Sequence, residues 1–295
     1  MIVFAFCVVS CFVDKERVTV NHYKIDGPAV ISFSGGATSG FMLNQILAAH
    51  GGELPNDVVV CFANTGLEHL KTLDFVNKVE TNWGIKIHWL EYRSVRNFVQ
   101  VDFQSASRKG EPFDLLINDK QYLPNPAARF CTIEMKIKTI SRFVREVFGF
   151  PDGYSDIMGL RYDEPSRVAR TKNSLNSDRE VCCPMYYAKH TLDDVEKFWN
   201  QNSFKLEIPR ILSNCVGCFL KGASKLDLIA RESPGSLEWW ADREERPFGI
   251  TDDGIEKRGV FRSDRPRYRN LIRMVDEQKL FDFPDDESMP CNCTD

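Results

Sequence analysis

Short apolar runs alternate with helix-like segments over the first third of the chain. The runs at residues 28–34, 57–62 and 85–90 are continuous, which is typical of strands that are buried on both faces. Residues 38–50 and 68–83 lie between these runs and read as helices. Strands that alternate with helices predict a parallel sheet with crossover helices, so the expected fold class is α/β.

The pattern changes in the rest of the chain. Residues 93–130 contain several prolines and little clear period, and we expect an insertion or lid there. Residues 132–148 read as one strongly amphipathic helix, and residues 154–159 read as a further strand. From about residue 185 the pattern is mainly helical, which predicts a helical C-terminal part beside the α/β core.

A glycine-rich loop at residues 34–40, Ser-Gly-Gly-Ala-Thr-Ser-Gly, joins the first predicted strand to the first predicted helix. Glycines let a backbone approach a ligand closely, and the N–H groups at a helix N-terminus attract anions. The loop lacks the Gly-Lys-Ser/Thr ending of a Walker A loop and the Gly-x-Gly-x-x-Gly spacing of dinucleotide folds. Taken alone, it also suits a plain strand-to-helix turn that Thr38 or Ser39 caps.

Four segments, in order along the chain, resemble the motifs of one family. The first resembles the SGGxxS pyrophosphate loop of the PP-loop superfamily, whose members are adenine nucleotide alpha-hydrolase-like proteins. The others resemble the DTG element of the second strand, an R-x-C-T-x-x-x-K segment and a G-x-R-x-x-E-x-x-R segment. The segments are Ser34–Ser39, Phe62–Gly66, Arg129–Lys136 and Gly159–Arg167. Over roughly residues 28–245 the chain is therefore similar to the phosphoadenosine phosphosulfate (PAPS) reductase family, particularly its phage- and prophage-type members.

The resemblance implies that the protein binds ATP or an adenylyl sulfate. The phosphates would be held by N–H and hydroxyl donors of the loop. A second group of contacts lies at the end of the second strand, the rim where open α/β sheets bind ligands. Arg161 would grip a phosphate or sulfate in a bidentate manner. The implied nucleotide-binding residues are Ser34, Gly35, Gly36, Thr38, Ser39, Asn64, Thr65, Gly66 and Arg161.

Plainer alternatives exist for two of these side chains. Asn64 also suits a simple turn, because asparagine is a common turn former. Arg161 also suits a surface ion pair with Asp163 or Glu164, which follow it closely.

The N-terminus bears on the redox state of the ten cysteines. Residues 1–13 are apolar, but no basic residue precedes the apolar run and no small-residue cleavage site is clear. The run is also too short to span a bilayer. We expect an added leader, a misplaced start or an edge strand here, and a cytoplasmic protein with reduced thiols and no membrane partner.

Cys215-Val-Gly-Cys218 has a spacing that lets two thiols reach one metal centre. By itself this pair suits half a zinc site, a redox dithiol or an iron–sulfur cluster. A structural zinc site needs four ligands, but neither a second Cys-x-x-Cys nor a histidine pair at zinc-finger spacing follows this pair. The sequence therefore argues against a zinc site. The resemblance implies a 4Fe–4S cluster with Cys131 as the third thiol. The fourth ligand stays open between Cys293, Cys183 and none.

The C-terminus departs from the family pattern. Sulfonucleotide reductases carry their nucleophilic cysteine in an E-C-G-x-H segment, whereas this chain ends Pro-Cys-Asn-Cys-Thr-Asp. Cys291 and Cys293 remain candidate catalytic thiols, together with Arg161. Because the Glu, Gly and His are missing, sulfur transfer to an acceptor is slightly favoured over sulfonucleotide reduction. A thiol protein would then donate electrons or sulfur.

The charge of the chain limits the partners that it can attract electrostatically. The chain has a net charge of −4 and a pI of about 5.8, which gives no general attraction to nucleic acid or to anionic membranes. Residues 261–269 are locally rich in arginine, with Tyr268 among them. Such a stretch suits a phosphate backbone and a stacked base, so a nucleic-acid acceptor is one expectation, and a solvated surface is the plainer one.

These observations predict three regions and one function. The regions are an N-terminal extension at 1–25, a PP-loop nucleotide-binding α/β domain at 26–185, and a helical C-terminal region with the Cys-x-x-Cys at 186–295. The predicted function is a nucleotide-dependent enzyme of sulfur chemistry with an iron–sulfur cluster. The alternative is a non-catalytic nucleotide sensor that contains a structural zinc ion.

Overall fold

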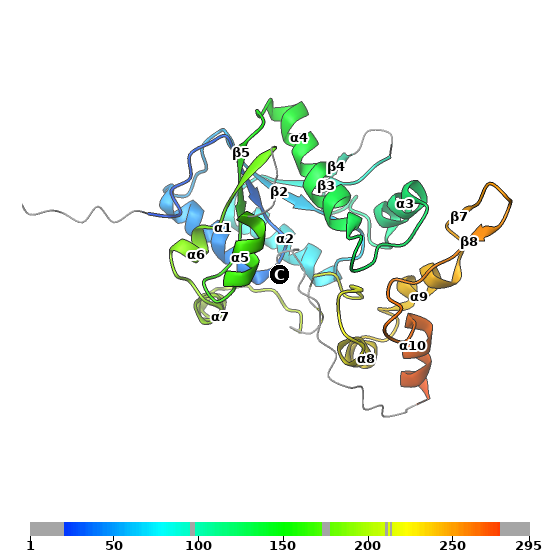
Figure 1. Ribbon diagram of the computed structural model, residues 1–295. Helices are drawn as coiled ribbons and strands as arrows, with labels where there is room; N and C mark the ends of the chain where they lie inside the picture. Colours follow the sequence, from blue (N-terminus) through cyan, green and yellow to red (C-terminus); the bar gives the residue numbers. More distant parts are fainter. Residues whose placement is uncertain (1–20, 95–97, 173–177, 210–211, 213, 278–295) are drawn as a thin grey trace, which may run out of the picture.

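The computed structural model describes residues 21–94, 98–172, 178–209, 212 and 214–277 (Figure 1). Its centre is a six-stranded sheet with the order β4-β3-β2-β1-β5-β6, in which only the edge pair of β3 and β4 is antiparallel. The expected α/β fold with a mainly parallel sheet is therefore confirmed. The strands are β1 (Ala29–Ser32), β2 (Val58–Ala63), β3 (Ile87–Glu91), β4 (Val99–Val101), β5 (Tyr154–Met158) and β6 (Arg179–Cys182).

Helices cover both faces of this sheet. Three of them, α1 (Ala37–Ala49), α2 (Leu70–Trp83) and α7 (Leu192–Gln201), pack on one face around a large apolar cluster. Helix α4 (Thr139–Phe148) packs on the other face. Every residue of β2 is buried, and its side chains alternate between the two clusters, which explains why its sequence is continuously apolar.

A third apolar cluster, the cluster of the C-terminal helices, lies beside the sheet. It is formed by α3 (Glu111–Lys120), α8 (Ala223–Glu232), α9 (Glu238–Glu245) and α10 (Tyr268–Asp276). Figure 1 shows α3 beside β3 and β4, above α9 and α10 of this C-terminal group. A small hairpin of β7 (Gly249–Ile250) and β8 (Glu256–Lys257) projects from the group.

The structure differs from the sequence prediction in two places. The aperiodic stretch at 93–130 contains β4 and the ten-residue helix α3, which begins directly after Gly110 with a proline in its first turn. The helix expected at 132–148 is divided into a π-helix, η1 (Cys131–Lys138), followed by α4. The Thr139 hydroxyl donates to the carbonyl oxygen of Glu134, five residues earlier, at 2.8 Å, which supports the wider turn.

Two short helices complete the edge of the sheet. They are α5 (Pro165–Lys172), which follows β5, and α6 (Pro184–Tyr187), which follows β6. The proposed boundary at residue 185 stays a prediction, although α7 packs on the same cluster as α1. The apolar segment 1–13 lies outside the described residues. Among the described residues, no helix has the length and apolar character needed to cross a membrane.

Trp199 is the main contact between α7 and the start of α1. Its indole N–H donates to the Ala37 carbonyl oxygen at 2.8 Å, and its ring packs on Phe75. We expect Trp199→Ala to lower the free energy of unfolding by about 3–5 kcal/mol, because it leaves a large cavity. Urea denaturation measures this. Val147→Ala, at an exposed site on α4, is the control and should change it by less than about 0.5 kcal/mol.

Candidate functional site

The glycine loop turns sharply between β1 and α1. Gly35 has a φ of 77°, and a Cβ added there would lie 2.7 Å from Thr72 Cγ2 on α2. The Gly36 N–H donates to the Ser34 hydroxyl at 3.3 Å, and the Ser34 and Ser39 hydroxyls are 2.9 Å apart. Ser39 is fully buried and donates to the Gly36 carbonyl oxygen at 3.0 Å. The serines therefore hold the loop in a closed shape.

The N-terminus of α1 suits an anion. Its N-cap residue is Gly36, and Thr38 and Ser39 lie inside the first turn, so neither is the cap that a plain turn would have needed. Gly36 has no side chain with which to cap the helix, and the first turn contains no acidic residue. N–H groups and the helix dipole at such an end attract negative charge.

The loop lies where the strand order reverses. The chain runs from β1 to β2 on one side, whereas β5 pairs with β1 on the other. Ligands of open α/β sheets bind in the crevice at this switch point. The two sides are close here, because a Cβ added to Gly159, after β5, would lie 3.2 Å from the Ser39 Cα.

Arg161 spans this crevice. Its guanidinium donates to the Thr38 hydroxyl at 3.2 Å and to Asp163 at 2.9 Å. Glu164 accepts the Arg161 backbone N–H at 3.1 Å and also pairs with Arg167. The expected ion pair with Asp163 is therefore present, and it holds Arg161 against the loop, whereas a grip on phosphate or sulfate stays a prediction.

Asn64 lies at the carboxyl end of β2 but is fully buried. Its amide nitrogen donates to Glu91 at 2.7 Å and to the Ser107 carbonyl oxygen at 2.9 Å, and its amide oxygen accepts the Gly66 N–H at 3.1 Å. Thr65 donates in the same way to the buried Glu68. A direct contact of these side chains with a nucleotide stays a prediction, and the geometry gives them a positioning role.

Glu91 and Ser107 are functional candidates that sequence reasoning missed. The Glu91 carboxylate is fully buried and accepts from Asn64, from Arg93, and from both the N–H and the hydroxyl of Ser107. The sequence contains a signal for Glu91, because a carboxylate directly follows the apolar run at residues 85–90. Ser107 lies in the aperiodic stretch, and nothing in its sequence context indicates its partner.

The Cys-x-x-Cys segment is attached directly to the glycine loop. The Asn214 amide nitrogen donates to the Ser34 carbonyl oxygen at 3.1 Å, and the Asn214 carbonyl oxygen accepts the His69 N–H at 3.2 Å. Glu68 and Cys215 form an isolated antiparallel bridge. The structure therefore places a cysteine pair beside the loop that is expected to bind phosphate.

A buried lysine shapes the cysteine turn. The Lys221 ammonium donates to the carbonyl oxygens of Leu212, Cys215 and Val216 at 2.7–2.8 Å. The turn also closes through the Cys218 N–H, which donates to the Cys215 carbonyl oxygen at 3.2 Å. These bonds fix the backbone that carries both thiols.

Aromatic rings enclose the same turn from the other side. The Tyr268 hydroxyl donates to the Gly217 carbonyl oxygen at 2.6 Å. A Cβ on Gly217 would lie 2.1 Å from the Trp240 indole nitrogen, so only glycine fits there. The cysteine turn therefore sits on the core of the C-terminal helices.

The three proposed cluster thiols all contact the apolar cluster of the C-terminal helices. Cys131, Cys215 and Cys218 are each half-buried and pack against it. Within the described residues, however, no three His, Cys, Asp or Glu side chains are arranged around a common metal position. The thiols suit an iron–sulfur centre in chemical type, but their described arrangement does not form a ligand set, so we derive no step through such a group.

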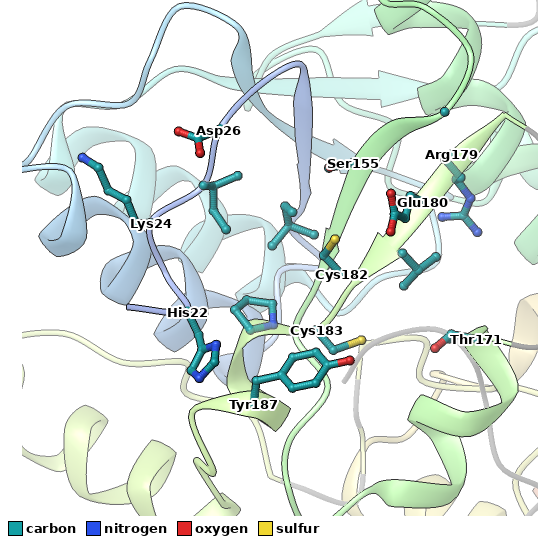
Figure 2. Close-up of a pocket in the computed structure, with 15 residues that line it drawn as sticks. His22, Lys24, Asp26, Ser155, Thr171, Arg179, Glu180, Cys182, Cys183 and Tyr187 are labelled. Carbon is teal, nitrogen blue, oxygen red and sulfur yellow. The ribbon is translucent and has the colours of Figure 1, made fainter. Parts of the chain in front are cut away.

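The other cysteines have separate surroundings. Cys61 is in the sheet, and burial raises the pKa of its thiol. Cys183, one candidate for the fourth ligand, lines a cavity of about 750 Å³ at the sheet edge with Cys182 (Figure 2), and none of the three proposed cluster thiols lines it. Cys291 and Cys293 lie outside the described residues, so their proposed roles stay predictions.

The arginines of the stretch at 261–269 are held mainly by neighbouring groups. Arg269 pairs with Glu238, Asp242 and Glu245, and its hydrogen bonds to Glu245 and Glu238 raise its pKa. Arg262 is buried and pairs with Asp264. Ion pairs within the protein therefore stabilise this part of the surface.

Gly35→Ala tests the shape of the loop. The added methyl group would meet α2 and would force a left-handed φ on a non-glycine residue. We expect a loss of about 1–3 kcal/mol of stability and a loss of ATP binding, measured by denaturation and calorimetry. Gly51→Ala has a similar φ but meets no atom within 4 Å, so it should retain ATP binding. Equal binding by both variants would contradict the loop assignment.

Lys221→Met tests the cysteine turn. It removes a buried ammonium from three carbonyl oxygens, and we expect it to lower the free energy of unfolding by about 2–5 kcal/mol. Cys215 and Cys218 should then react faster with a thiol reagent. Lys205→Met, at an exposed position, is the control and should have little effect on either measurement. An unchanged thiol reaction rate in Lys221→Met would argue against this role.

Comparisons with known proteins give the following similarities. No protein-family model matches the chain. An uncharacterized nin region protein of Escherichia phage lambda is 28% identical over 215 residues, which is 70% of each chain. An uncharacterized protein of Methanocaldococcus jannaschii is 26% identical over 257 residues, which is 81% of this chain and 46% of the archaeal one.

Two solved structures are also similar. The PAPS reductase of Candida auris in a phosphate complex has 16% identity and a TM-score of 0.41, over 61% of this chain and 75% of that one. A U34-tRNA thiolase of Methanococcus maripaludis with its 4Fe–4S cluster has 16% identity and a TM-score of 0.41, over 70% of this chain and 68% of that one. At these values, neither similarity defines the activity of this chain.

Proposed function

We propose that this protein is an enzyme of sulfur chemistry that binds ATP or an adenylyl sulfate at the glycine loop. One observation carries the proposal: Asn214 bonds to the Ser34 carbonyl oxygen and so holds the Cys-x-x-Cys turn beside the loop. A nucleotide site and a thiol pair that were unrelated in function would not need this direct attachment.

The loop side of the site supports nucleotide binding. The N-terminus of α1 offers backbone N–H groups at the switch point of the sheet, and the Ser34 and Ser39 hydroxyls lie beside it. Arg161 brings a guanidinium to the same place and is suited to a phosphate or sulfate group. An incoming anion would exchange with Thr38 or Asp163 as the partner of Arg161.

We expect an iron–sulfur cluster on Cys131, Cys215 and Cys218, with Cys293 or no residue as the fourth ligand. Among the described residues these thiols are not gathered around a common metal position, so the cluster stays a prediction. The chain itself contributes three half-buried thiols and a turn that Lys221 holds. Such a cluster, when bound, would supply sulfur or electrons.

Two reactions are compatible with this proposal, namely sulfonucleotide reduction and sulfur transfer. In sulfonucleotide reduction, a thiolate of Cys293 or Cys291 would attack the sulfur, and the S–O bond to the nucleotide phosphate would break, so that the nucleotide leaves and a cysteine S-sulfonate forms. A dithiol reductant would then release sulfite and become a disulfide. In sulfur transfer, an acceptor oxygen would be adenylated with release of pyrophosphate, and sulfur would then displace AMP.

The metal content separates this proposal from its alternative. Protein purified without oxygen should contain iron and acid-labile sulfide, and should show a broad absorption band in the blue. A colourless protein with stoichiometric zinc would instead support a sensor module with a structural metal. Incubation with ATP, and separately with adenylyl sulfates, should release pyrophosphate and AMP in transfer, or sulfite in reduction.

Arg161→Gln tests the nucleotide side. Loss of the charged hydrogen bonds should weaken ATP binding about 10- to 100-fold, measured by calorimetry. Arg170→Gln, at an exposed position on the adjacent α5, is the matched control and should bind ATP as the parent protein does. If both variants bind ATP equally well, Arg161 does not contact the nucleotide.

A further inference from the structure

His69 is the N-cap residue of α2, and its half-buried imidazole ring is held by the start of that helix. The ring nitrogen Nδ1 accepts the backbone N–H of Lys71 at 3.1 Å. A ring nitrogen that accepts a hydrogen bond carries no proton, so the neutral ring has its proton on Nε2. Within the part of the chain that the structure describes, no group is bonded to Nε2. The helix cap therefore leaves one N–H donor of the ring unused.

The backbone of His69 attaches the ring to the cysteine turn. Its N–H donates to the Asn214 carbonyl oxygen at 3.2 Å, and the preceding residue, Glu68, forms the bridge with Cys215. Asn214 in turn bonds to the Ser34 carbonyl oxygen on the glycine loop. His69 thus contacts the residue that joins the loop to the thiols.

The first turn of α2 also packs against the glycine loop. The Thr72 N–H donates to the His69 carbonyl oxygen at 2.8 Å, so the two residues share one turn. Thr72 is fully buried, and its Cγ2 would lie 2.7 Å from a Cβ added to Gly35. Two separate sets of contacts, one through Asn214 and one through Thr72, therefore place His69 where the loop and the cysteine turn meet.

The surroundings of the ring favour its neutral form. Burial and the Lys71 ammonium group lower the pKa of His69, and Asp74 only partly opposes them. The positive end of the α2 dipole acts in the same direction, and the first turn of α2 contains no acidic residue. Protonation of Nδ1 would also remove the acceptor of the Lys71 N–H. At neutral pH the ring is therefore a neutral donor through Nε2, as other imidazoles at helix N-termini are.

We propose that the Nε2–H group of His69 donates a hydrogen bond to a phosphate or sulfate oxygen of the nucleotide bound at the glycine loop. This contact rests on the proposed function and adds one residue to the same site. An anion is favoured here, because α1 begins at the loop and the first turn of α2 packs on it. Arg161 is already paired with Asp163, whereas the neutral ring is not drawn into an ion pair and keeps its donor available.

A role as helix cap alone is the alternative, and two substitutions separate it from nucleotide contact. His69→Asn keeps the cap, because asparagine is a strong N-cap residue, but it removes Nε2–H. We expect this variant to unfold as the parent protein does and to bind ATP about 10- to 100-fold more weakly by calorimetry. His69→Gln places an amide N–H near the position of Nε2, so it should keep most of the ATP binding. His50→Asn, at the opposite end of α1 from the loop, is the control and should bind ATP as the parent does.

Nuclear magnetic resonance of protein with isotope-labelled histidine provides a measurement that a cap alone would not change. In the free protein at neutral pH, Nδ1 of His69 should give the signal of an unprotonated nitrogen and Nε2 that of a protonated one. The spectrum of His69→Asn lacks both signals and so assigns them. ATP, and separately adenylyl sulfate, is then added. The nucleotide that shifts the Nε2–H signal is the one whose oxygen accepts the bond.

Three results would overturn the inference: a proton on Nδ1 in the free protein, an Nε2–H signal that neither nucleotide shifts, or equal nucleotide binding by His69→Asn and the parent. Each of them leaves the proposed function intact, provided that the parent protein binds a nucleotide. A parent protein that binds neither ATP nor adenylyl sulfate would instead overturn the proposed function, and this contact with it.

Discussion

The bond between the Asn214 side chain and the Ser34 carbonyl oxygen joins the two halves of this protein at the place where chemistry is expected. One half is the parallel sheet with its glycine loop, and the other is the helical group that carries the cysteine turn. Apolar packing also connects the two parts, because the cluster of the C-terminal helices includes side chains of α3 and η1. At the loop itself, the position of the thiols depends on polar contacts, namely this bond, the His69 N–H bond and the Glu68 bridge.

Two buried charged side chains also hold segments of the site together. A buried carboxylate or ammonium is costly unless hydrogen bonds satisfy it, and it then orders the groups that it contacts. Glu91 orders Asn64 and Ser107 at the rim of the sheet, and Lys221 orders the cysteine turn. In both cases a single ionic side chain gathers segments that have no regular structure of their own. The rigidity of the site therefore comes from these polar centres as much as from the apolar packing.

Sequence reasoning found the features that periodic patterns encode. The central strands, the helices α1 and α2, and the glycine loop were predicted because continuous apolar runs and glycines have local causes. Helix α3 was missed because prolines and polar residues interrupt its apolar face, and η1 was read as part of one helix because its sequence period is nearly helical. The partners of Asn64, Lys221 and His69 come from distant segments. No local pattern indicates such pairs, so only the fold could supply them.

The long sequence separation of the Asn214–Ser34 bond has a consequence for biosynthesis. The two residues are 180 positions apart, so the ribosome makes the loop long before it makes the residue that joins the loop to the thiols. At about 5–20 residues per second, this interval is on the order of ten to forty seconds. During that time the nascent chain displays a phosphate-attracting loop without its cysteine turn. A nucleotide bound early would then stabilise the sheet half and provide a preformed surface on which the C-terminal half docks.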